Sequence, residues 1–185
     1  MQQSEIGVTL NNANLVISVL GQDRPGIIDR LAKVILDCQC SIQDSRMAVL
    51  GGEFALIQLV SGDSKHIKTL ESTLPALADE LTLSINTRQT QSRTGTTDKL
   101  PYRVEVIAMD HPGIVQTVAA FFSTRGINIE EMNTGSYAAA HTGTPMFSLE
   151  MSVAIPAAAS VSSLKHEFTD FCDELNLDGA LEPEI

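Results

Sequence analysis

The sequence lacks tryptophan and has few other aromatic residues, which make up 4% of its 185 positions. Proteins that bind single-stranded nucleic acid stack successive bases on aromatic side chains, so this kind of binding is disfavoured. Positive charge is also scarce, since 12 Lys and Arg stand against 23 Asp and Glu and the net charge is −11. Because phosphates are neutralised by clustered Lys and Arg, we expect no direct binding to nucleic acid or to an anionic membrane.

Long apolar runs and a signal peptide are absent as well. No stretch approaches the roughly 20 apolar residues that cross a bilayer, and the first residues, MQQSEIGVTLNN, contain no basic segment. Cysteines number only three, Cys38, Cys40 and Cys172. An odd count without a signal peptide is typical of a reducing compartment rather than of a disulfide framework. We therefore expect a cytoplasmic protein without a membrane anchor.

Residues that resemble catalytic or metal-binding groups have simpler structural interpretations. The four histidines are His66, His111, His141 and His166. They do not form His-x-x-x-His or another metal-ligand spacing, and Cys38-x-Cys40 has no second cysteine pair, which favours buried thiols. No phosphate-binding, dinucleotide-binding or Gly-x-Ser-x-Gly motif occurs. We expect no catalytic residue, no metal and no cofactor.

The clearest signal in the sequence is an internal repeat. Residues 15–27, LVISVLGQDRPGI, align without a gap with residues 102–114, YRVEVIAMDHPGI, at an offset of 87 positions. Further along, Asp79-Glu80-Leu81 matches Asp173-Glu174-Leu175. Each copy has about 80 residues, which is the length of a small domain. The segment between the copies is polar, so we expect a first module at residues 1–88, a linker at 89–100 and a second module at 101–185.

Both copies are predicted to contain a strand, a helix, a hairpin of two strands, a second helix and a last strand. In the first copy these elements are residues 14–20, a helix that ends near 38, and then 41–50, 53–61, 64–80 and 82–87. In the second copy they are residues 102–109, a helix that ends near 126, and then 128–138, 145–155, 158–174 and 179–184. The order β-α-β-β-α-β is typical of the ferredoxin-like plan, in which two helices cover one face of a four-stranded antiparallel sheet. The predicted fold class is α+β, with two such modules in tandem.

The Asp-x-Pro-Gly loop after the first strand is the candidate site of each module. Asp23 and Asp110 are interpreted as N-cap residues of the helix that follows. Gly26 and Gly113 carry no side chain, so a ligand can approach the backbone there. Free N–H groups and the positive end of the helix dipole favour a carboxylate at this position. The same pattern is also compatible with a turn that binds nothing.

The segment from Asp23 to Ile27 resembles the opening loop of the ACT domain, a small ligand-sensing module of amino-acid metabolism. Gly126-Ile127-Asn128-Ile129 resembles the Gly-x-Asn-Ile that opens the second strand of that family, whereas the first copy has Ser41 in place of the Asn. The resemblance covers residues 14–88 and 101–184. It implies that an amino acid binds between paired modules, held by the first loop and by the start of the second strand.

Carried over by position, this resemblance implies ligand-binding residues in both modules. They are Asp23, Arg24, Pro25, Gly26, Ile27, Ser41 and Asp44 in the first module, and Asp110, His111, Pro112, Gly113, Ile114, Asn128 and Glu131 in the second. The two sites are not expected to be equivalent. Arg24 stays charged and can hold a carboxylate with two hydrogen bonds, whereas His111 can do so only when it is protonated.

Three classes of function follow from these observations. The resemblance implies a non-enzymatic regulator, a transcriptional repressor that binds a small amino acid, with glycine as the first candidate, and acts through a DNA-binding transcriptional activator protein. The alternative is a detached regulatory subunit of an amino-acid-metabolising enzyme. An enzyme in its own right is disfavoured because no acid–base constellation is visible. We also expect a homodimer, because modules of this size are small for an independent core and ACT-like sheets tend to pair.

Overall fold

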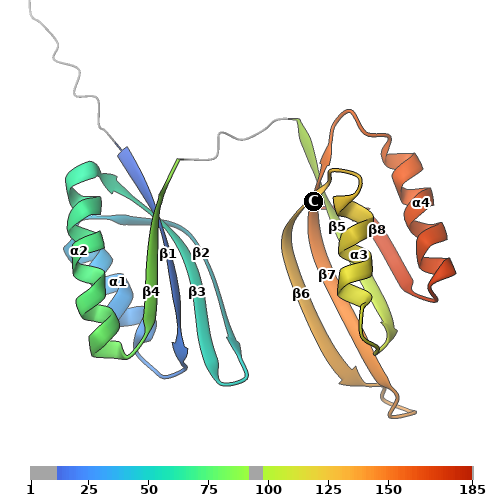
Figure 1. Ribbon diagram of the computed structural model, residues 1–185, viewed down its shortest axis with the longest axis horizontal. Helices are drawn as coiled ribbons and strands as arrows, with labels where there is room; N and C mark the ends of the chain where they lie inside the picture. The colour runs from blue at the N-terminus through green and yellow to red at the C-terminus, as the bar shows by residue number, and fades with distance from the viewer. Residues whose placement is uncertain (1–11, 92–97, 185) are drawn as a thin grey trace, which may run out of the picture. The chain divides into compact units, whose positions relative to one another are not determined.

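Every strand and helix predicted from the repeat is present in the structure, a computed structural model in which residues 12–91 and 98–184 are described. The first six elements are β1 (Asn12–Gln22), α1 (Ile27–Asp37), β2 (Ser41–Leu50), β3 (Glu53–Asp63), α2 (Ser64–Leu81) and β4 (Ser84–Thr90). The next six are β5 (Lys99–Met109), α3 (Ile114–Ser123), β6 (Asn128–Ala138), β7 (Pro145–Pro156), α4 (Val161–Glu174) and β8 (Asp178–Pro183) (Figure 1).

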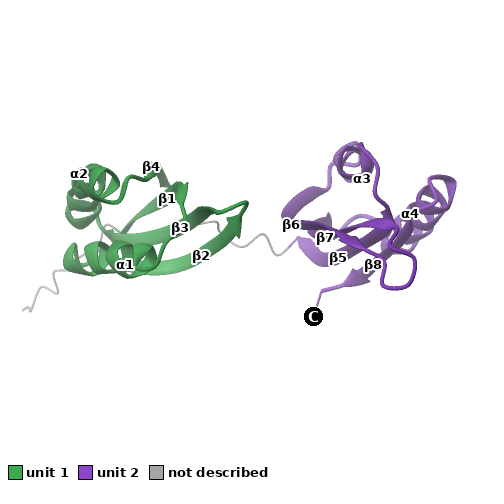
Figure 2. Ribbon diagram, turned by 90° about the horizontal axis from the view of Figure 1, so that it is seen from below, with its two compact units in different colours: residues 1–94 green, residues 95–185 purple. Residues whose placement is uncertain are grey.

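The strands form two four-stranded sheets with the same topology. Their orders are β2-β3-β1-β4 and β6-β7-β5-β8, and all neighbouring strands are antiparallel. The chain divides into two compact units, residues 1–94 and 95–185, each with one sheet and its two helices (Figure 2). The α+β class and the tandem ferredoxin-like modules predicted from the sequence are therefore confirmed.

Each module has its own core between the sheet and the helices. Along β1, Leu15, Ile17 and Val19 are buried, and the residues between them are less so, because successive side chains of a strand point to opposite faces. The equivalent residues of β5 are Val104, Val106 and Ala108, which are buried as well. The helices complete the cores with apolar residues at helical spacing. These are Ile27, Leu31 and Ile35 in α1 and Ile114, Val118, Phe121 and Phe122 in α3.

The first helices end slightly earlier than the sequence predicts, at Asp37 and Ser123. Beyond them, Gln39 and Gly126 occupy equivalent repeat positions and both have left-handed backbones, with φ of 56° and 68°. The following amides, of Cys40 and Ile127, donate back into the last helical turn at 3.0 and 3.1 Å. Both helices thus end in a Schellman-type motif. The left-handed residue of this motif is usually a glycine, as at Gly126, whereas in the first module it is Gln39.

The three cysteines are buried and free, as predicted from their number and spacing. Burial raises the pKa of Cys40, and it raises the pKa of Cys172 to about 11. Because the thiolate is the reactive and metal-binding form, Cys40 and Cys172 are poor nucleophiles and poor ligands. Within residues 12–91 and 98–184, no group of His, Cys, Asp and Glu is arranged to hold a metal ion, and no helix is long and apolar enough to cross a membrane.

The second module compensates for a larger helix residue with a smaller strand residue. A Cβ atom added at Gly179 of β8 would lie 2.3 Å from the Sγ atom of Cys172 on α4. Gly179 pairs with Val106, as Ile85 of β4 pairs with Val19 at the equivalent place in the first module. There the helix residue equivalent to Cys172 is Ala78, so a small helix residue is combined with a large strand residue.

We predict that Gly179→Ala lowers the free energy of unfolding by roughly 1–3 kcal/mol, because the new methyl group overlaps the Cys172 sulfur. Adding Cys172→Ala to it should recover part of this loss. Gly135→Ala is the matched control in β6, where the nearest atom would be 3.6 Å away. Urea unfolding of the four proteins measures these differences, and equal losses for Gly179→Ala and Gly135→Ala would contradict the interpretation.

Candidate functional site

The loop that precedes α1 and α3 closes with a glycine rather than an aspartate cap. Gly26 and Gly113 are the N-cap residues, and their φ angles of 96° and 104° lie in the left-handed region that favours glycine. The interpretation of Asp23 and Asp110 as N-cap residues is therefore wrong. They lie three residues before the cap, because the proline and the left-handed glycine turn the chain before the first helical residue.

Asp23 and Asp110 instead extend the pairing of the central strands. The Asp23 N–H donates to the carbonyl of Gly52 at 3.0 Å, and the Asp110 N–H donates to the carbonyl of Pro145 at 3.0 Å. The Asp110 carboxylate accepts a hydrogen bond from the Ser136 hydroxyl at 3.1 Å. Each loop is thus anchored to the hairpin beside it. The aspartate side chain makes no hydrogen bond that caps the helix.

The first helix of each module has no side-chain cap, whereas the second helix has one. Neither Gly26 nor Gly113 offers a side-chain acceptor to the first turn. At the start of α2, the Asp63 carboxylate accepts hydrogen bonds from the N–H groups of His66 and Lys65 at 2.8 and 2.9 Å, and chiefly the bond from His66 lowers the pKa of Asp63. At α4, the Ser160 hydroxyl accepts from the Ser163 N–H at 3.4 Å. The first-turn amides of α1 and α3 thus have no such side-chain acceptor and are available to a ligand.

The second loop lines an open hollow of about 740 Å³. Its lining consists of the whole stretch Asp110–Gln116 together with Ala119 and Phe147. The structure thus places all five predicted loop residues of this module around one hollow. Apart from Gly113 and its two chain neighbours, no atom of the described residues lies within 4 Å of the position where a Cβ of residue 113 would stand. The backbone of the cap is therefore accessible, and a side chain there would occupy the space of the hollow.

Several lining residues were not among the predicted site residues. Phe147 lies in β7 opposite Ala108, so the strand register brings it beneath the loop. The repeat does pair it with Phe54, but that match indicates a core residue and not a site. Gln116 and Ala119 follow the loop in the first two turns of α3. Their spacing from Gly113 is the only signal in the sequence that could have found them.

The first loop has the same backbone but a different polar partner. Gly26 also has no atom within 4 Å of its missing Cβ. Arg24 donates from Nη2 to the carbonyl of Leu81 at the end of α2, where a cation is favourable. In the second loop His111 occupies this position, and its Nδ1 lies 3.1 Å from the carbonyl oxygen of Pro112. Arg24 and His111 thus have different surroundings, and the two loops differ beyond their backbones.

Within one module, the loop and the start of the second strand lie at opposite ends of the sheet. Ser41 is level with Asn14, and Asn128 is level with Pro101, at the beginnings of β1 and β5. The loops follow the other ends of these strands, eight residues further along. At roughly 3.4 Å per residue this is a separation of about 27 Å. A module therefore does not bring its own Ser41 or Asn128 to its own loop.

Asp44 and Glu131 each follow a bulge in the second strand. The register shifts between Ile42 and Asp44 in β2, and at the equivalent place between Ile129 and Glu131 in β6. Asp44 accepts hydrogen bonds from the Arg46 side chain at 2.5 Å and from the Ser45 N–H at 2.8 Å.

On β6, the Asn128 amide donates to Glu130 at 2.7 Å, and Glu131 lines a small hollow of about 110 Å³ beside Arg103 and Glu150. These residues and those of β2 described above are placed along the second strands, away from the loops of their own modules.

The fold is that of ACT-domain proteins. A sequence profile described as the ACT domain matches residues 13–88, which is the first module. The chain is 34% identical over 167 residues to the glycine cleavage system transcriptional repressor of Escherichia coli K12. This alignment covers 90% of this chain and 88% of the repressor. The chain belongs to the family of this repressor and is a regulatory ACT protein with two ACT-like modules.

Solved structures support the same family assignment over both modules. A crystal structure provisionally described as a glycine cleavage system transcriptional repressor is 28% identical and covers 92% of this chain and 96% of its own, with a TM-score of 0.72. A protein of unknown function from Galdieria sulphuraria is 31% identical and covers 94% and 99%, with a TM-score of 0.81.

The cap assignment can be tested within the second module. We predict that Ser160→Ala lowers the free energy of unfolding by roughly 0.5–1 kcal/mol, because it removes the side-chain cap of α4. Asp110→Ala should cost less, because Asp110 caps no helix and its removal loses only an exposed hydrogen bond from Ser136. Urea unfolding followed by circular dichroism compares the two. A larger loss for Asp110→Ala than for Ser160→Ala would contradict this assignment of the caps.

Proposed function

We propose that the protein is a non-enzymatic transcriptional repressor of the glycine cleavage system, which binds a small amino acid at its strand-to-helix loops and acts through a DNA-binding activator protein. The observation that carries the ligand part of this proposal is the uncapped start of α3, which opens into a hollow. The family assignment carries the regulatory part. The alternative as a detached subunit of an enzyme is supported by no comparable observation.

The loop fits the carboxylate of an amino acid. The first-turn amides of α3 point out of the helix N-terminus, where the helix dipole adds a partial positive charge. Gly113 lets the ligand approach the backbone, since the space beside its Cα is open. A capped helix such as α4 has a hydroxyl in the corresponding place. Glycine suits such a loop because it has no side chain that would need a pocket of its own.

The expected affinity is modest. Glycine has five non-hydrogen atoms, and at a ceiling of roughly 1.5 kcal/mol per atom its dissociation constant is a few micromolar at best. Values of tens to hundreds of micromolar are more typical for such a ligand and suit the sensing of an abundant metabolite. A coupling of about 1–3 kcal/mol between ligand and partner changes partner affinity by about 5- to 150-fold.

The rest of the predicted site requires two modules. Because Ser41 and Asn128 lie about 27 Å along the sheet from the loop of their own module, they can contact a ligand only at the loop of another module. We therefore propose that modules pair so that the second strand of one approaches the loop of the other. This pairing is proposed within a homodimer.

The partner is proposed to be a protein because the chain itself is unsuited to DNA. With a net charge of −11 it would be repelled by phosphates. A regulator of this charge instead suits a basic DNA-binding activator, whose positive surface it attracts. We therefore propose that the protein acts in the cytoplasm, where the activator binds its genes.

We predict that the loop glycines control ligand binding. Gly113→Ala should remove one class of glycine site, and the double variant Gly26→Ala with Gly113→Ala should bind no glycine, because the methyl groups fill the space beside the caps. Gly126→Ala is the matched control, since Gly126 also has a positive φ and open space but lies at the other end of α3. Calorimetry with glycine, alanine and serine measures the sites. Equal loss in Gly126→Ala, or no loss in the double variant, would contradict the proposal.

The homodimer is predicted to use the open face of the first sheet, where large apolar side chains are exposed on the two central strands. Leu20 and Ile57 lie on this face and are each 54% exposed. The same face of the second sheet carries ion pairs of Arg103 with Glu105 and Glu150 at 2.8 and 3.0 Å.

In sedimentation at micromolar concentration the wild type should be a dimer. Ile57→Glu should be a monomer, because it places a charge in an apolar interface. Ile107→Glu is the control on the second sheet, where the substituted side chain lies on the corresponding open face, and it should remain dimeric. A monomeric wild type would rule out this interface.

A further inference from the structure

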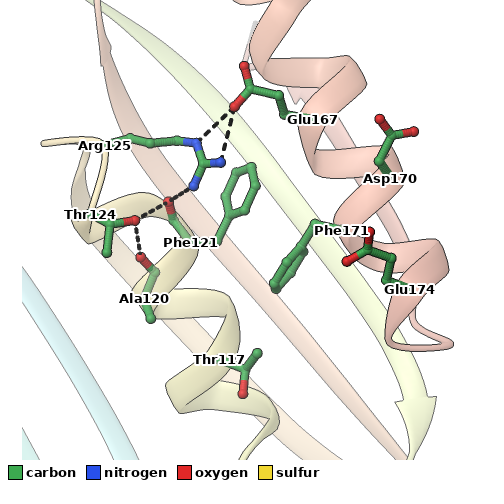
Figure 3. A pocket seen from close by; sticks show the side chains of 9 residues that line it. All are labelled: Thr117, Ala120, Phe121, Thr124, Arg125, Glu167, Asp170, Phe171 and Glu174. Carbon is green, nitrogen blue, oxygen red and sulfur yellow. Dashed lines mark hydrogen bonds and ion pairs between the residues drawn. The ribbon is translucent and has the colours of Figure 1, made fainter.

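A second hollow lies between the two helices of the second module, away from the loop. It has a volume of about 510 Å³, and Figure 3 shows the rings of Phe121 and Phe171 standing between α3 and α4. The α4 side carries three carboxylates, those of Glu167, Asp170 and Glu174. We call this hollow the α3–α4 groove. Its apolar floor and acidic rim suit an occupant that is cationic and has an apolar stem.

One end of the α3–α4 groove is closed by Arg125. Its Nε and Nη2 donate to Glu167 at 3.1 and 3.0 Å, and its Nη1 donates to the carbonyl of Phe121 at 2.8 Å. The guanidinium carbon lies 3.8 Å from the centre of the Phe121 ring, a cation–π contact. The hydrogen bonds from Arg125, and a further one from Ser163, lower the pKa of Glu167. The Glu167 carboxylate is therefore already paired within the module, with Arg125 and Ser163.

In the first module an ion pair joins the two helices at the other end of the corresponding groove. Arg30 of α1 donates to Glu80 of α2 through three hydrogen bonds of 2.6, 2.7 and 3.1 Å. This paired arrangement raises the pKa of Arg30. The pair is half-exposed, but its geometry is that of the two-pronged guanidinium–carboxylate contact.

The second module retains the glutamate of this pair as Glu174 but has Thr117 in place of the arginine. Thr117 is equivalent to Arg30, since their N–H groups donate to the carbonyls of Gly113 and Gly26 in the same helical turn. Glu174 is equivalent to Glu80, since both follow an aspartate whose carbonyl accepts an amide N–H three residues later. The helix starts and ends therefore confirm the alignment of the repeat.

The carboxylate of Glu174 consequently has no counter-ion of its own. Within the described part of the chain it makes no hydrogen bond or ion pair, and the Thr117 hydroxyl donates to the carbonyl of Gly113 instead. Asp170, one turn before Glu174, has only His166 at 3.8 Å. Both carboxylates line the α3–α4 groove, so its open end has an uncompensated negative charge.

We propose that the α3–α4 groove binds an arginine side chain from a basic segment of the partner protein, which takes the place that Arg30 holds in the first module. Its guanidinium would pair with Glu174 and stack against the Phe171 ring, as that of Arg125 stacks against Phe121. Arginine is favoured over lysine because its planar group combines both contacts. This inference rests on the proposed function for the identity of the partner, the DNA-binding activator.

Binding of the purified activator to the full chain tests the proposal. Glu174→Arg should weaken binding about tenfold or more, because it replaces the attraction by repulsion. Thr117→Arg should weaken it as well, because the new arginine pairs with Glu174 and fills the groove. Asp173→Arg is the matched control, since it makes the same change of charge on an exposed neighbour that does not line the groove. Activator affinities that are equal in Glu174→Arg and Asp173→Arg would overturn the proposal.

A second measurement separates this proposal from the choice of partner. N-acetyl-arginine amide, a probe with one positive charge and no carboxylate, is titrated into the isotope-labelled full chain and followed by NMR. We expect saturable shifts of Thr117, Phe171 and Glu174 in the wild type and none in Glu174→Gln. If the activator does not bind the wild type, the proposed function fails, and the probe decides alone about the groove. No shifts, or the same shifts in Glu174→Gln, would exclude an arginine site.

If the groove variants leave activator binding unchanged but alter the sedimentation of the chain, the occupant is a second copy of this protein. That result would also overturn the proposal.

Discussion

The left-handed glycine that opens the first helix of each module is the constraint on which the proposed site depends. With φ near 100°, Gly26 and Gly113 start the helix at a residue that has no side chain to cap it. The first-turn amides thus remain without a side-chain acceptor, and the space beside the glycine remains open. The aspartate and proline before it serve to anchor and turn the loop. A residue with a Cβ atom would be strained at this position and would obstruct the same space.

The two modules share a backbone fold but differ in the side chains that lie between their two helices. The first module joins its helices through Arg30 and Glu80, whereas the second retains Glu174 opposite Thr117. The second module has the larger aromatic core, in which Phe121, Phe122 and Phe168 lie edge to face or tilted against one another. The two modules therefore differ in which end of the helix pair an ion pair joins, Arg30–Glu80 in the first and Arg125–Glu167 in the second.

The fold could be predicted from the sequence because alternation in the strands and helical spacing in the helices are local signals, and the repeat presents each of them twice. The aspartate caps were predicted wrongly because Asp precedes Pro-Gly in a pattern that permits a cap at either residue, and only the backbone angle of Gly113 decides between them. Phe147 and Glu174 were not predicted as site residues for another reason. Their roles depend on which strand or helix lies opposite, and that is set by tertiary packing rather than by spacing along the chain.

The most direct test of the carboxylate site is an NMR titration of the full chain with glycine, in which the backbone amides are followed one by one. We predict saturable shifts of the Gly113, Ile114, Val115 and Gln116 amides and of their equivalents from Gly26 onward. The first-turn amides of α2 and α4, which are bonded to Asp63 and Ser160, should not move. Glycine binding that leaves the amides of α1 and α3 unshifted would contradict a carboxylate site at these loops.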